Sequence, residues 1–394
     1  MARAARCLLS FVLIVIALCF SAVVRAEISS AASASDLNEP TEPVITEVVN
    51  SEPILSAANL FNPLHYATAH VESQFRHFIR RYGKVYNSYE EYMRRLSVFK
   101  RNLEKALHHQ TLDPTAVHGV TPYSDLTEEE FATHFLGLHD LALLASKSAP
   151  APVLSVHDLP ANFDWRDHGA VTPVKTQGLC GACWAFTTTG VLEGAHFVAT
   201  GNLINLSEQQ LIDCDKQCDP KNIRACDSGC SGGLMTNAYQ YAMEAGGLMK
   251  EEDYPYTARV GQCRFNKDKV AVKVNNFTTI PLDEDQIAAN LVKHGPLAVG
   301  LNAAFMQTYI GGVSCPLICS KLFVNHGVLL VGYKERGFAP LRLSNKPYWI
   351  LKNSWGQHWG EKGFYKLCRG FSECGMNTMV SAAVAASVDS KNVE

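Results

Sequence analysis

The run QGLCGACWAF, residues 177–186, decides the fold and the chemistry of this chain. Its second cysteine, Cys183, is followed by a mostly apolar stretch that runs on to Ala195. We therefore expect Cys183 to open a helix. Because the N-terminal end of a helix carries partial positive charge, this position favours the thiolate, which is the reactive form of cysteine. The run predicts that Cys183 is a nucleophile.

A C-x-x-C pair has other interpretations, and each needs a different context. A redox dithiol lies early in a βαβ domain, whereas Cys180 and Cys183 follow a long segment with no such unit. A zinc site needs a closed set of ligands at regular spacing, which the remaining cysteines do not provide. As a third alternative, the two cysteines belong to two disulfides. Partner residues further along the chain favour the nucleophile interpretation.

These partners are His326 and Asn353, which each lie beside an apolar, β-branched run that is typical of a strand. His326 precedes the run 328–331, and Asn353 follows the run 348–351. A thiol nucleophile needs a base that keeps the sulfur ionised and later protonates the leaving group. It also needs a third group that fixes the tautomer of the base. The sequence predicts His326 as the base and Asn353 as the orienting group.

These residues fit the C-G-[SA]-C-[WY] signature around a catalytic cysteine, and the chain resembles papain-family cysteine proteases from about Phe75 to Ser381. It is most similar to the cathepsin F-like branch found in plants. The resemblance implies an α+β, papain-like fold of two domains, a helical left domain and a β-barrel right domain, with the cleft between them. It also implies a helical inhibitory propeptide in front of them, and it implies no cofactor or metal.

The resemblance assigns further roles in the cleft. Gln177 would donate its side-chain amide to the oxyanion hole, together with the backbone N–H of Cys183. A donor aimed at a developing oxyanion contributes about 3 kcal/mol. Trp355 would cover the hydrogen bond between the histidine and the asparagine, with Trp359 nearby.

Two features depart from the family pattern. Leu179 and Ala182 stand where the family usually has a polar residue and a serine. Asn353 follows Cys183 by 170 residues, more than the roughly 130–150 expected. The insert 334–345 accounts for part of this difference, and we expect it to form a surface loop.

Length and composition fit an enzyme with additional segments. The chain has 394 residues, too many for one ordinary domain of about 150. Its hydrophobic content of 47% is ample for a packed core. The net charge of −3 is close to neutral, so it implies no nucleic-acid or anionic-membrane partner.

The N-terminal residues 1–26 have the pattern of a secretory signal peptide. Basic Arg3 precedes an apolar stretch at 8–24, and small residues allow cleavage after Ala26. A membrane anchor is the alternative, but an apolar stretch of about 17 residues is at the short limit for a span. Residues 27–66 begin with a Ser-, Ala-, Glu- and Pro-rich stretch and are interpreted as a flexible linker.

The cysteine count fits one free thiol in an oxidising compartment. The chain has 13 cysteines, of which two leave with the signal peptide and Cys183 stays free, so ten remain for five disulfides. The resemblance implies three pairs: Cys180–Cys230, Cys214–Cys263 and Cys319–Cys374. The remaining cysteines would pair by elimination as Cys218–Cys226 and Cys315–Cys368, although sequence alone does not determine connectivity.

Residues 67–140 are expected to form the inhibitory propeptide. A long helix is predicted from about Tyr89 to Gln110, because residues spaced by three and four positions share one face: Glu91, Arg95, Phe99, Asn102, Ala106 and Gln110. Their identities resemble the propeptide helix motif of the cathepsin F-like branch. A second propeptide motif is resembled by Gly119, Thr121, Tyr123 and Asp125. The resemblance implies autoinhibition by the segment from about Ser124 to Pro152, which would run through the cleft in reverse of the substrate direction.

The propeptide also carries charges that predict acid-triggered maturation. We expect a charge-dependent dock formed by Asp125 and five arginines, namely Arg76, Arg80, Arg81, Arg94 and Arg95. Protonation of carboxylates at low pH would loosen it. Residues 141–158 are interpreted as a processing linker, 159–381 as the peptidase domain and 382–394 as a C-terminal tail.

The peptidase region divides into a helical half and a strand-rich half. One helix is expected to open with a capping box at Ser207 and Gln210, and another follows Gly233. Strands are predicted at 270–274, 297–301, 328–333, 348–351 and 363–367.

Substrate preference is argued from the cleft walls. Gly232 and Gly233 would let an extended peptide pair with the backbone, although two glycines also make an ordinary turn. The resemblance places five residues around the pocket for the P2 side chain: Leu234, Met235, Gly300, Val324 and Met379. Because all are apolar or lack a side chain, they predict a hydrophobic P2 residue and disfavour arginine there. Asn205 and Asn276 begin N-glycosylation sequons.

The sequence as a whole predicts a cysteine endopeptidase made as a zymogen and delivered to the secretory pathway, for a lytic vacuole, a lysosome or the extracellular space. The expected partners are peptide and protein substrates, its own propeptide and cystatin-type inhibitors. We expect a monomer without nucleic-acid or membrane partners after signal cleavage. Two alternatives stay open: a thiol–disulfide oxidoreductase that uses Cys180 and Cys183, and a catalytically inactive binding protein on a protease scaffold.

Overall fold

The central element of the peptidase region is helix α6 (Cys183–Thr200), which begins at the predicted nucleophile. It is seen in a computed structural model that describes residues 68–139, 150–219, 222–339 and 344–386. Most of its side chains are buried, as in a helix that is covered on all sides. Close packing uses its glycines, since a Cβ on Gly190 would lie 2.8 Å from Leu329 and one on Gly194 would lie 2.5 Å from Pro296.

The propeptide region is helical, as predicted. It contains α3 (Thr68–Tyr82), α4 (Tyr89–Leu112), strand β1 (Ala116–His118) and α5 (Glu128–Phe135). Aromatic rings of α3 and α4 pack together in a small separate core. The polar residues of the α4 motif hold the segment that follows: Arg95 donates to the Asp125 carbonyl at 2.9 Å, and Asn102 donates to the Ser124 carbonyl at 2.8 Å.

Two helix starts show where the capping prediction fails and where a cap was missed. Ser207 accepts a hydrogen bond from the Gln210 backbone N–H at 3.0 Å and starts α7 (Glu208–Cys214). The reciprocal bond of a capping box is not formed there, because the Gln210 Oε1 accepts from the Met249 N–H at 2.8 Å and the Ser207 N–H donates to the Met249 carbonyl at 3.0 Å. A complete capping box occurs at α5, between Thr127 and Glu130.

The main sheet has eight strands and is antiparallel throughout. Its strand order is β11-β10-β9-β7-β12-β6-β5, and β2 (Phe163–Asp164) pairs with β9. The strands are β5 (Leu248–Met249), β6 (Val270–Thr279), β7 (Leu297–Leu301), β9 (His326–Ala339), β10 (Ser344–Lys352), β11 (Phe364–Cys368) and β12 (Val380–Ala386). All five predicted strands are present; β12 and helix α9 (Glu284–His294) were not predicted.

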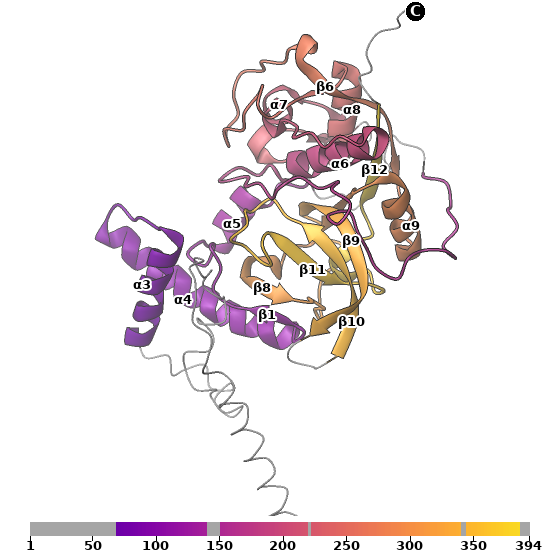
Figure 1. Ribbon diagram of the computed structural model, residues 1–394. Coiled ribbons are helices and arrows are strands. Elements are labelled where there is room, and N and C mark those ends of the chain that lie inside the picture. The colour runs from indigo at the N-terminus through magenta and orange to yellow at the C-terminus, as the bar shows by residue number, and fades with distance from the viewer. Residues whose placement is uncertain (1–67, 140–149, 220–221, 340–343, 387–394) are drawn as a thin grey trace, which may run out of the picture. The chain divides into compact units, whose positions relative to one another are not determined.

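The expected barrel is not closed among the described residues. The outer strands of the path, β11 and β5, do not pair with each other. The reason is that β6 and β12 extend to the helical half, where they pack against α6 and α8 (Met235–Ala245). Figure 1 shows α6 between α8 and the strands β9 and β12. The sheet therefore ends against helices.

The insert at 334–345 was expected to be a surface loop, and this expectation is wrong for most of it. Strands β9 and β10 continue through the insert as an antiparallel hairpin, with Ala339 opposite Ser344 and Gly337 opposite Lys346. Only residues 340–343 lie outside the described part of the insert. The extra residues lengthen two strands that already pair, so their backbone groups find partners in the ladder.

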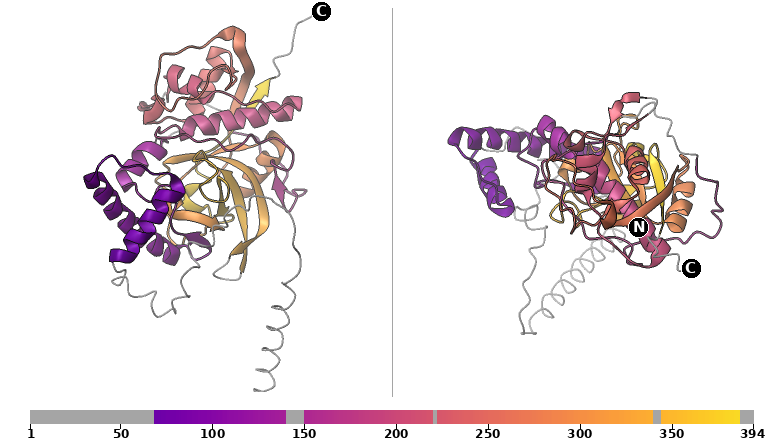
Figure 2. Two further views of the ribbon diagram at one scale, coloured as in Figure 1. Left: turned by 60° about the vertical axis from the view of Figure 1, so that its left-hand side comes forward. Right: turned by 90° about the horizontal axis from the view of Figure 1, so that it is seen from above.

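The propeptide also pairs with the peptidase region through backbone. Strand β1 is antiparallel to β8 (Tyr309–Gly312), with Ala116 opposite Gly312. A further small hairpin joins β3 (Cys218–Asp219) and β4 (Asn222–Cys226). The left view of Figure 2 shows α6 lying across one end of the sheet, where it packs against β12 and β9. All described residues belong to one unit, Phe61–Glu394.

The structure contains all five expected disulfides, including the two proposed by elimination. Cys183 is the free cysteine among the described residues. Within the same residues no helix is long and apolar enough to cross a bilayer. The expected signal peptide, at residues 1–26, and the expected linker at 27–66 lie outside the described ranges.

Candidate active site

The Cys183 thiol lies at the first residue of α6 and is fully buried. Its Sγ accepts two backbone hydrogen bonds, from the Gly327 N–H at 3.4 Å and from the Gly137 N–H at 3.3 Å. Gly327 belongs to β9, directly after His326, so the first bond ties the thiol to the strand that carries the histidine. Gly137 belongs to the propeptide region and covers the sulfur.

His326 and Asn353 meet as the sequence predicts. The imidazole Nε2 lies 2.8 Å from the Asn353 Oδ1, which also accepts a hydrogen bond from the Ser354 N–H at 2.8 Å. Because an amide oxygen only accepts, the proton of the neutral imidazole resides on Nε2. The Phe135 backbone of the propeptide also favours the charged imidazole, while the buried Nδ1 receives no donor from any described residue. Its lone pair is therefore available to a neighbouring thiol.

An aromatic cluster covers this pair. The rings of Trp355 and His326 have centroids 4.7 Å apart, and Trp359 lies behind at 4.9 Å from Trp355. On its other side Trp355 contacts the propeptide rings of Phe131 at 5.1 Å and Tyr123 at 5.7 Å. The Tyr123 hydroxyl also donates to the Trp355 carbonyl at 2.8 Å. Water is kept from the histidine by this packing.

The Gln177 side chain has a fixed orientation. Its Oε1 accepts from the Ser354 hydroxyl at 2.6 Å, so its Nε2 faces the other way and donates to the Cys180 carbonyl at 2.8 Å. The same Nε2 lies 3.4 Å from the carbonyl oxygens of His134 and Phe135 in the propeptide. Carbonyl oxygens therefore already lie against the predicted oxyanion donor.

The propeptide crosses the site in an extended conformation after α5. Gly137 accepts a hydrogen bond from the Gly233 N–H at 2.9 Å, and the His139 N–H donates back to the Gly233 carbonyl at 3.4 Å. Leu138 and Gly233 form a parallel bridge, and the Leu138 N–H donates to the Asn325 carbonyl at 3.2 Å on the opposite wall. The described part of the crossing ends at His139, because residues 140–149 are outside the described ranges.

Leu138 packs against residues that were predicted to line the P2 pocket. A Cβ added to Gly300 would lie 2.9 Å from Leu138 Cδ2, 2.7 Å from Val324 Cγ1 and 3.0 Å from Met379 Sδ. Leu138 is 7% exposed and belongs to one apolar cluster with Leu234, Met235, Val324 and Met379. Gly300, Val324 and Met379 thus lie together around Leu138, and Leu234 and Met235 belong to the same larger core. Gly232 lies at the rim, where a Cβ would meet the Gly137 carbonyl at 3.0 Å.

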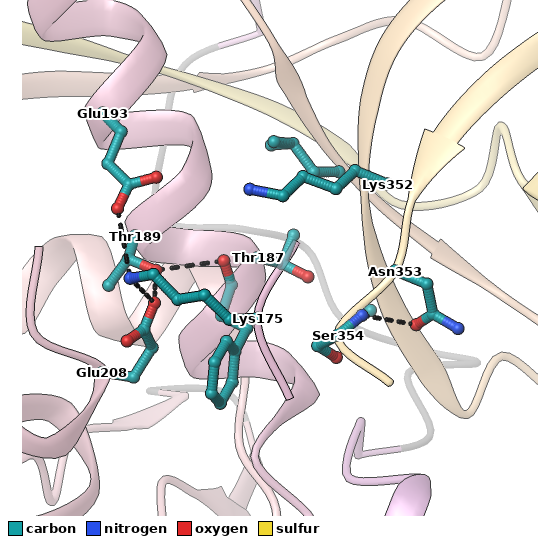
Figure 3. Close-up of a pocket in the computed structure, with 11 residues that line it drawn as sticks. Lys175, Thr187, Thr189, Glu193, Glu208, Lys352, Asn353 and Ser354 are labelled. Atoms are coloured by element: carbon teal, nitrogen blue, oxygen red, sulfur yellow. Dashed lines mark hydrogen bonds and ion pairs between the residues drawn. The ribbon is translucent and has the colours of Figure 1, made fainter. Parts of the chain in front are cut away.

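Behind Asn353 lies a charged pocket that joins the two halves of the peptidase region (Figure 3). Lys175 forms ion pairs with Glu208 of α7 at 2.7 Å and with Glu193 of α6 at 3.5 Å. Lys352, at the end of β10, donates to the Thr172 hydroxyl at 2.9 Å. Burial raises the pKa of Glu208 to about 7 although Lys175 opposes the shift. We interpret this cluster as structural, since its members pair with one another.

The covered site favours the neutral forms of both predicted catalytic groups. Burial raises the pKa of the Cys183 thiol to about 11, against the opposing backbone hydrogen bonds from Gly327 and Gly137. Burial lowers the pKa of His326 to about 4, against the hydrogen bond to Asn353. A thiol and a neutral imidazole are consistent with an inhibited enzyme.

The expected charge-dependent dock around Asp125 is wrong in its partners. Asp125 is buried and pairs with Lys84 at 2.9 Å and with the Tyr86 hydroxyl at 2.9 Å, both within the propeptide. Arg94 and Arg95 pair with Glu130, also within the propeptide, and Arg76 pairs with Glu72. These charges stabilise the propeptide fold. Other charged groups contact the peptidase region: the Lys105 ammonium donates to the Gln307 side-chain oxygen at 3.1 Å, and the buried Asp113 carboxylate accepts from the Cys315 N–H at 2.7 Å. Asp113 also pairs with His118 within the propeptide at 3.0 Å.

The remaining predictions concern modification and metal. Asn205 and Asn276 are both exposed, but the Ser207 hydroxyl of the first sequon is buried and donates to the Tyr254 carbonyl. Among the described residues no group of three or more His, Cys, Asp or Glu side chains could hold a metal ion.

Several contributors to the site carry no motif. Ser354, which orients Gln177, follows Asn353 directly, so its position beside a predicted site residue was the available signal. Gly137 and Leu138 lie in an unremarkable stretch, and their place in the cleft depends on contacts more than 40 residues away in sequence.

Comparisons with known proteins agree with this geometry. Residues 159–384 match the family described as papain family cysteine protease, and residues 75–131 match the cathepsin propeptide inhibitor domain. The chain is 65% identical over 323 residues to the probable cysteine protease RD19D of Arabidopsis thaliana, covering 82% of this chain and 88% of that one. It is 55% identical over 343 residues to cysteine proteinase 15A of Pisum sativum, covering 87% and 91%.

Among solved structures, the digestive procathepsin L2 proteinase of Tenebrio molitor is similar with a TM-score of 0.70 and 32% identity, covering 79% of this chain and 99% of that one. Sequence, fold and site geometry thus agree. The chain belongs to the papain family of cysteine proteases, as a peptidase made in zymogen form with a cathepsin-type inhibitory propeptide.

Proposed function

We propose that Cys183 and His326 are the catalytic pair, that Asn353 orients the imidazole, and that Gln177 with the Cys183 N–H stabilises the oxyanion. The thiol passes its proton to His326 Nδ1, and the sulfur attacks the peptide carbonyl carbon. His326 then protonates the leaving amine and an acyl-enzyme remains. Water, activated by His326, cleaves the thioester and restores the thiol. The orientation of Gln177 by Ser354 and the free Nδ1 support these roles.

Release of the propeptide would change the protonation of the pair. In the zymogen the Gly137 backbone and the rings of Phe131 and Tyr123 add to the cover over the two groups. Once solvent enters, burial no longer opposes ionisation, and the N-terminal end of α6 favours the thiolate. The active enzyme therefore works with a thiolate and an imidazolium.

The substrate class follows from one observation, the Leu138 side chain in the pocket of Gly300, Val324 and Met379. The propeptide fills this pocket with a leucine, and no acidic side chain is in that group. We infer a preference for peptides with Leu, Val or Phe at P2 and poor cleavage with Arg. The parallel bridge at Gly233 supports a propeptide that lies in reverse of a substrate, which would pair antiparallel.

This proposal is tested with acid-activated enzyme and two peptides that differ at P2, Leu or Arg. We expect kcat/KM to be at least about tenfold higher with Leu, because a guanidinium would be buried without a partner. Cys183→Ala should remove cleavage of both peptides. Preference for Arg would contradict the pocket assignment, and cleavage by the alanine variant would contradict the nucleophile.

We further infer that residues 1–26 direct the chain to the secretory pathway, for a vacuole, a lysosome or the extracellular space. The five disulfides support an oxidising route. In the same scheme the chain then continues as a linker (27–66), the inhibitory propeptide (67–140), a processing linker (141–158), the peptidase domain (159–381) and a C-terminal tail (382–394). Glycans on the exposed Asn205 and Asn276, inhibition by cystatin-type proteins and a monomeric enzyme are part of the same proposal.

A further inference from the structure

Two buried carboxyl groups lie directly behind the substrate-binding backbone at Gly233. The Asp227 Oδ1 accepts hydrogen bonds from the Leu234 N–H at 2.8 Å and from the Asn237 side chain at 3.2 Å. It also approaches Gly233 closely, since a Cβ there would lie 2.8 Å from this oxygen. Asp227 thus holds the rear of the segment 232–234, whose front pairs with the propeptide at Gly137.

The second carboxyl group belongs to Asp215, at the C-terminal end of α7. Its Oδ1 accepts from the Gln217 N–H at 2.8 Å, and its side chain is fully buried. The Oδ2 atoms of Asp215 and Asp227 are both buried and receive no N–H or O–H from any described residue. The backbone of Gln217 brings the two residues together, since its N–H donates to Asp215 and its carbonyl oxygen accepts from the Asp227 N–H at 2.8 Å. Burial raises the pKa of both carboxyl groups, and a hydrogen bond between them lowers the pKa of Asp215 and raises that of Asp227. Two carboxylates cannot make such a bond unless a proton lies between them.

The surroundings supply little compensation for a second negative charge. The charge of Lys216 lowers the pKa of Asp215 and the charge of Glu244 raises it, and both of these side chains are exposed. The charge of Asp215 also raises the pKa of Tyr241 in α8. In the zymogen His139 also faces this region, with its Nε2 3.0 Å from the Cys226 carbonyl oxygen. Burial, and the partner's charge, raise the pKa of Asp227 well above its usual range.

We propose that Asp215 and Asp227 share one proton, and that this proton holds the segment 232–234 in its substrate-binding conformation. Both residues are positioning residues that act through Gly233, and the inference rests on the proposed role of Gly233 in binding peptides. Loss of the proton leaves two buried negative charges that repel each other, and it weakens the hydrogen bond from the Leu234 N–H to Asp227. Because the proton is bound more tightly in the folded enzyme, the effect is absent at low pH and appears as the pH rises.

The experiment measures KM and kcat separately on acid-activated enzyme between pH 5 and 7.5, with the peptide that has Leu at P2. For the wild type we expect KM to rise by about fivefold or more, with a smaller change in kcat, because Gly233 binds the peptide and Cys183 is held by other contacts. Asp215→Asn replaces the shared proton by a permanent N–H donor and should flatten the rise in KM. Asp215→Ala offers no donor and should raise KM at every pH.

Glu244→Gln is the matched control, because it removes a nearby exposed charge and leaves the pair intact; its KM profile should follow the wild type. Asp227→Asn is a second test of the same kind, since its Oδ1 can still accept from Leu234. A KM of the wild type that does not change with pH would overturn the proposal, as would Asn variants that keep the wild-type rise. Absence of peptide cleavage by the wild type at all pH values would instead contradict the proposed function.

Discussion

At the scale of single residues, inhibition depends on the absence of a side chain at Gly137. A Cβ there would lie 1.9 Å from the Gly181 carbonyl oxygen, which is backbone and cannot move aside. The close approach lets the Gly137 N–H reach the sulfur of Cys183 at 3.3 Å. A propeptide residue thereby makes a contact that a larger residue would prevent.

We predict that Gly137→Ala exposes the thiol in the intact zymogen. The clash should cost about 1–3 kcal/mol of docking free energy or more, so iodoacetamide should label Cys183 at neutral pH at least about tenfold faster than in the wild type. Gly261→Ala is the control, because its φ is not positive and its Cβ would come no closer than 3.4 Å to another residue. Equal labelling of the Gly137 variant and the wild type would show that the backbone contact does not protect the sulfur.

At the scale of elements, the short helix α5 positions the inhibitory segment. Its capping box fixes its start, and two phenylalanines one turn apart, Phe131 and Phe135, form its buried face. Their rings stack at 5.5 Å and both contact Trp355. An eight-residue helix is too short to be stable alone, so its packing on Trp355 is what orders it.

Phe131→Ala should therefore release α5 while the peptidase region stays folded. Removal of a buried phenylalanine costs about 3–5 kcal/mol, which should appear as faster hydrogen exchange at 128–135 and as faster alkylation of Cys183. Phe131→Leu keeps most of the apolar volume and should show a smaller effect. Unchanged exchange in the alanine variant would mean that α5 is held by other contacts.

At the scale of the whole molecule, the zymogen binds protons less readily than its separated parts. His109 is buried against Thr308 of the peptidase region at 2.8 Å. Burial, with the charges of His118 and Lys105, lowers the pKa of His109 to about 3. His326 is likewise shifted to about 4 in the covered site. A histidine whose pKa is lowered by docking stabilises the docked state fully when the pH is above the ordinary histidine pKa of about 6.5. This stabilisation decreases as the pH falls from there towards the lowered pKa.

Maturation should therefore begin to accelerate as the pH falls below about 6.5. If carboxylates were the titrating groups, the acceleration would begin at a lower pH. Among the carboxylates, Glu130 has a lowered pKa: burial opposes this shift, but hydrogen bonds from the Thr127 backbone and Arg95 outweigh burial. The stability that this carboxylate contributes is therefore lost only below about pH 4.5. We predict that His109→Gln lowers the slope of log rate against pH by up to about one unit between pH 6.5 and 4.5. His108→Gln changes an exposed neighbour and should behave as the wild type. Identical pH profiles for the His109 variant and the wild type would contradict this.

Much of this organisation could be predicted from local patterns. The helix start at Cys183, the strands that carry His326 and Asn353, and the helix α4 follow from spacing and residue type within short windows. The hairpin at 334–345 was missed because its polar, glycine-containing stretch has no strand periodicity, and pairing with a neighbouring strand provides its order. Strand β12, rich in alanine, was missed for the same reason.

The sequence by itself predicted a nucleophile, its base and its orienting amide, because each of these residue types has few other uses in such a setting. Only the tertiary structure decided that Leu138 packs beside Gly300, that Asp125 pairs within the propeptide, and that Asp215 lies near Asp227. These are contacts between side chains brought close by packing. Local periodicity carries no information about distances between such side chains. The burial that packing produces then shifts the pKa values of Cys183 and His326.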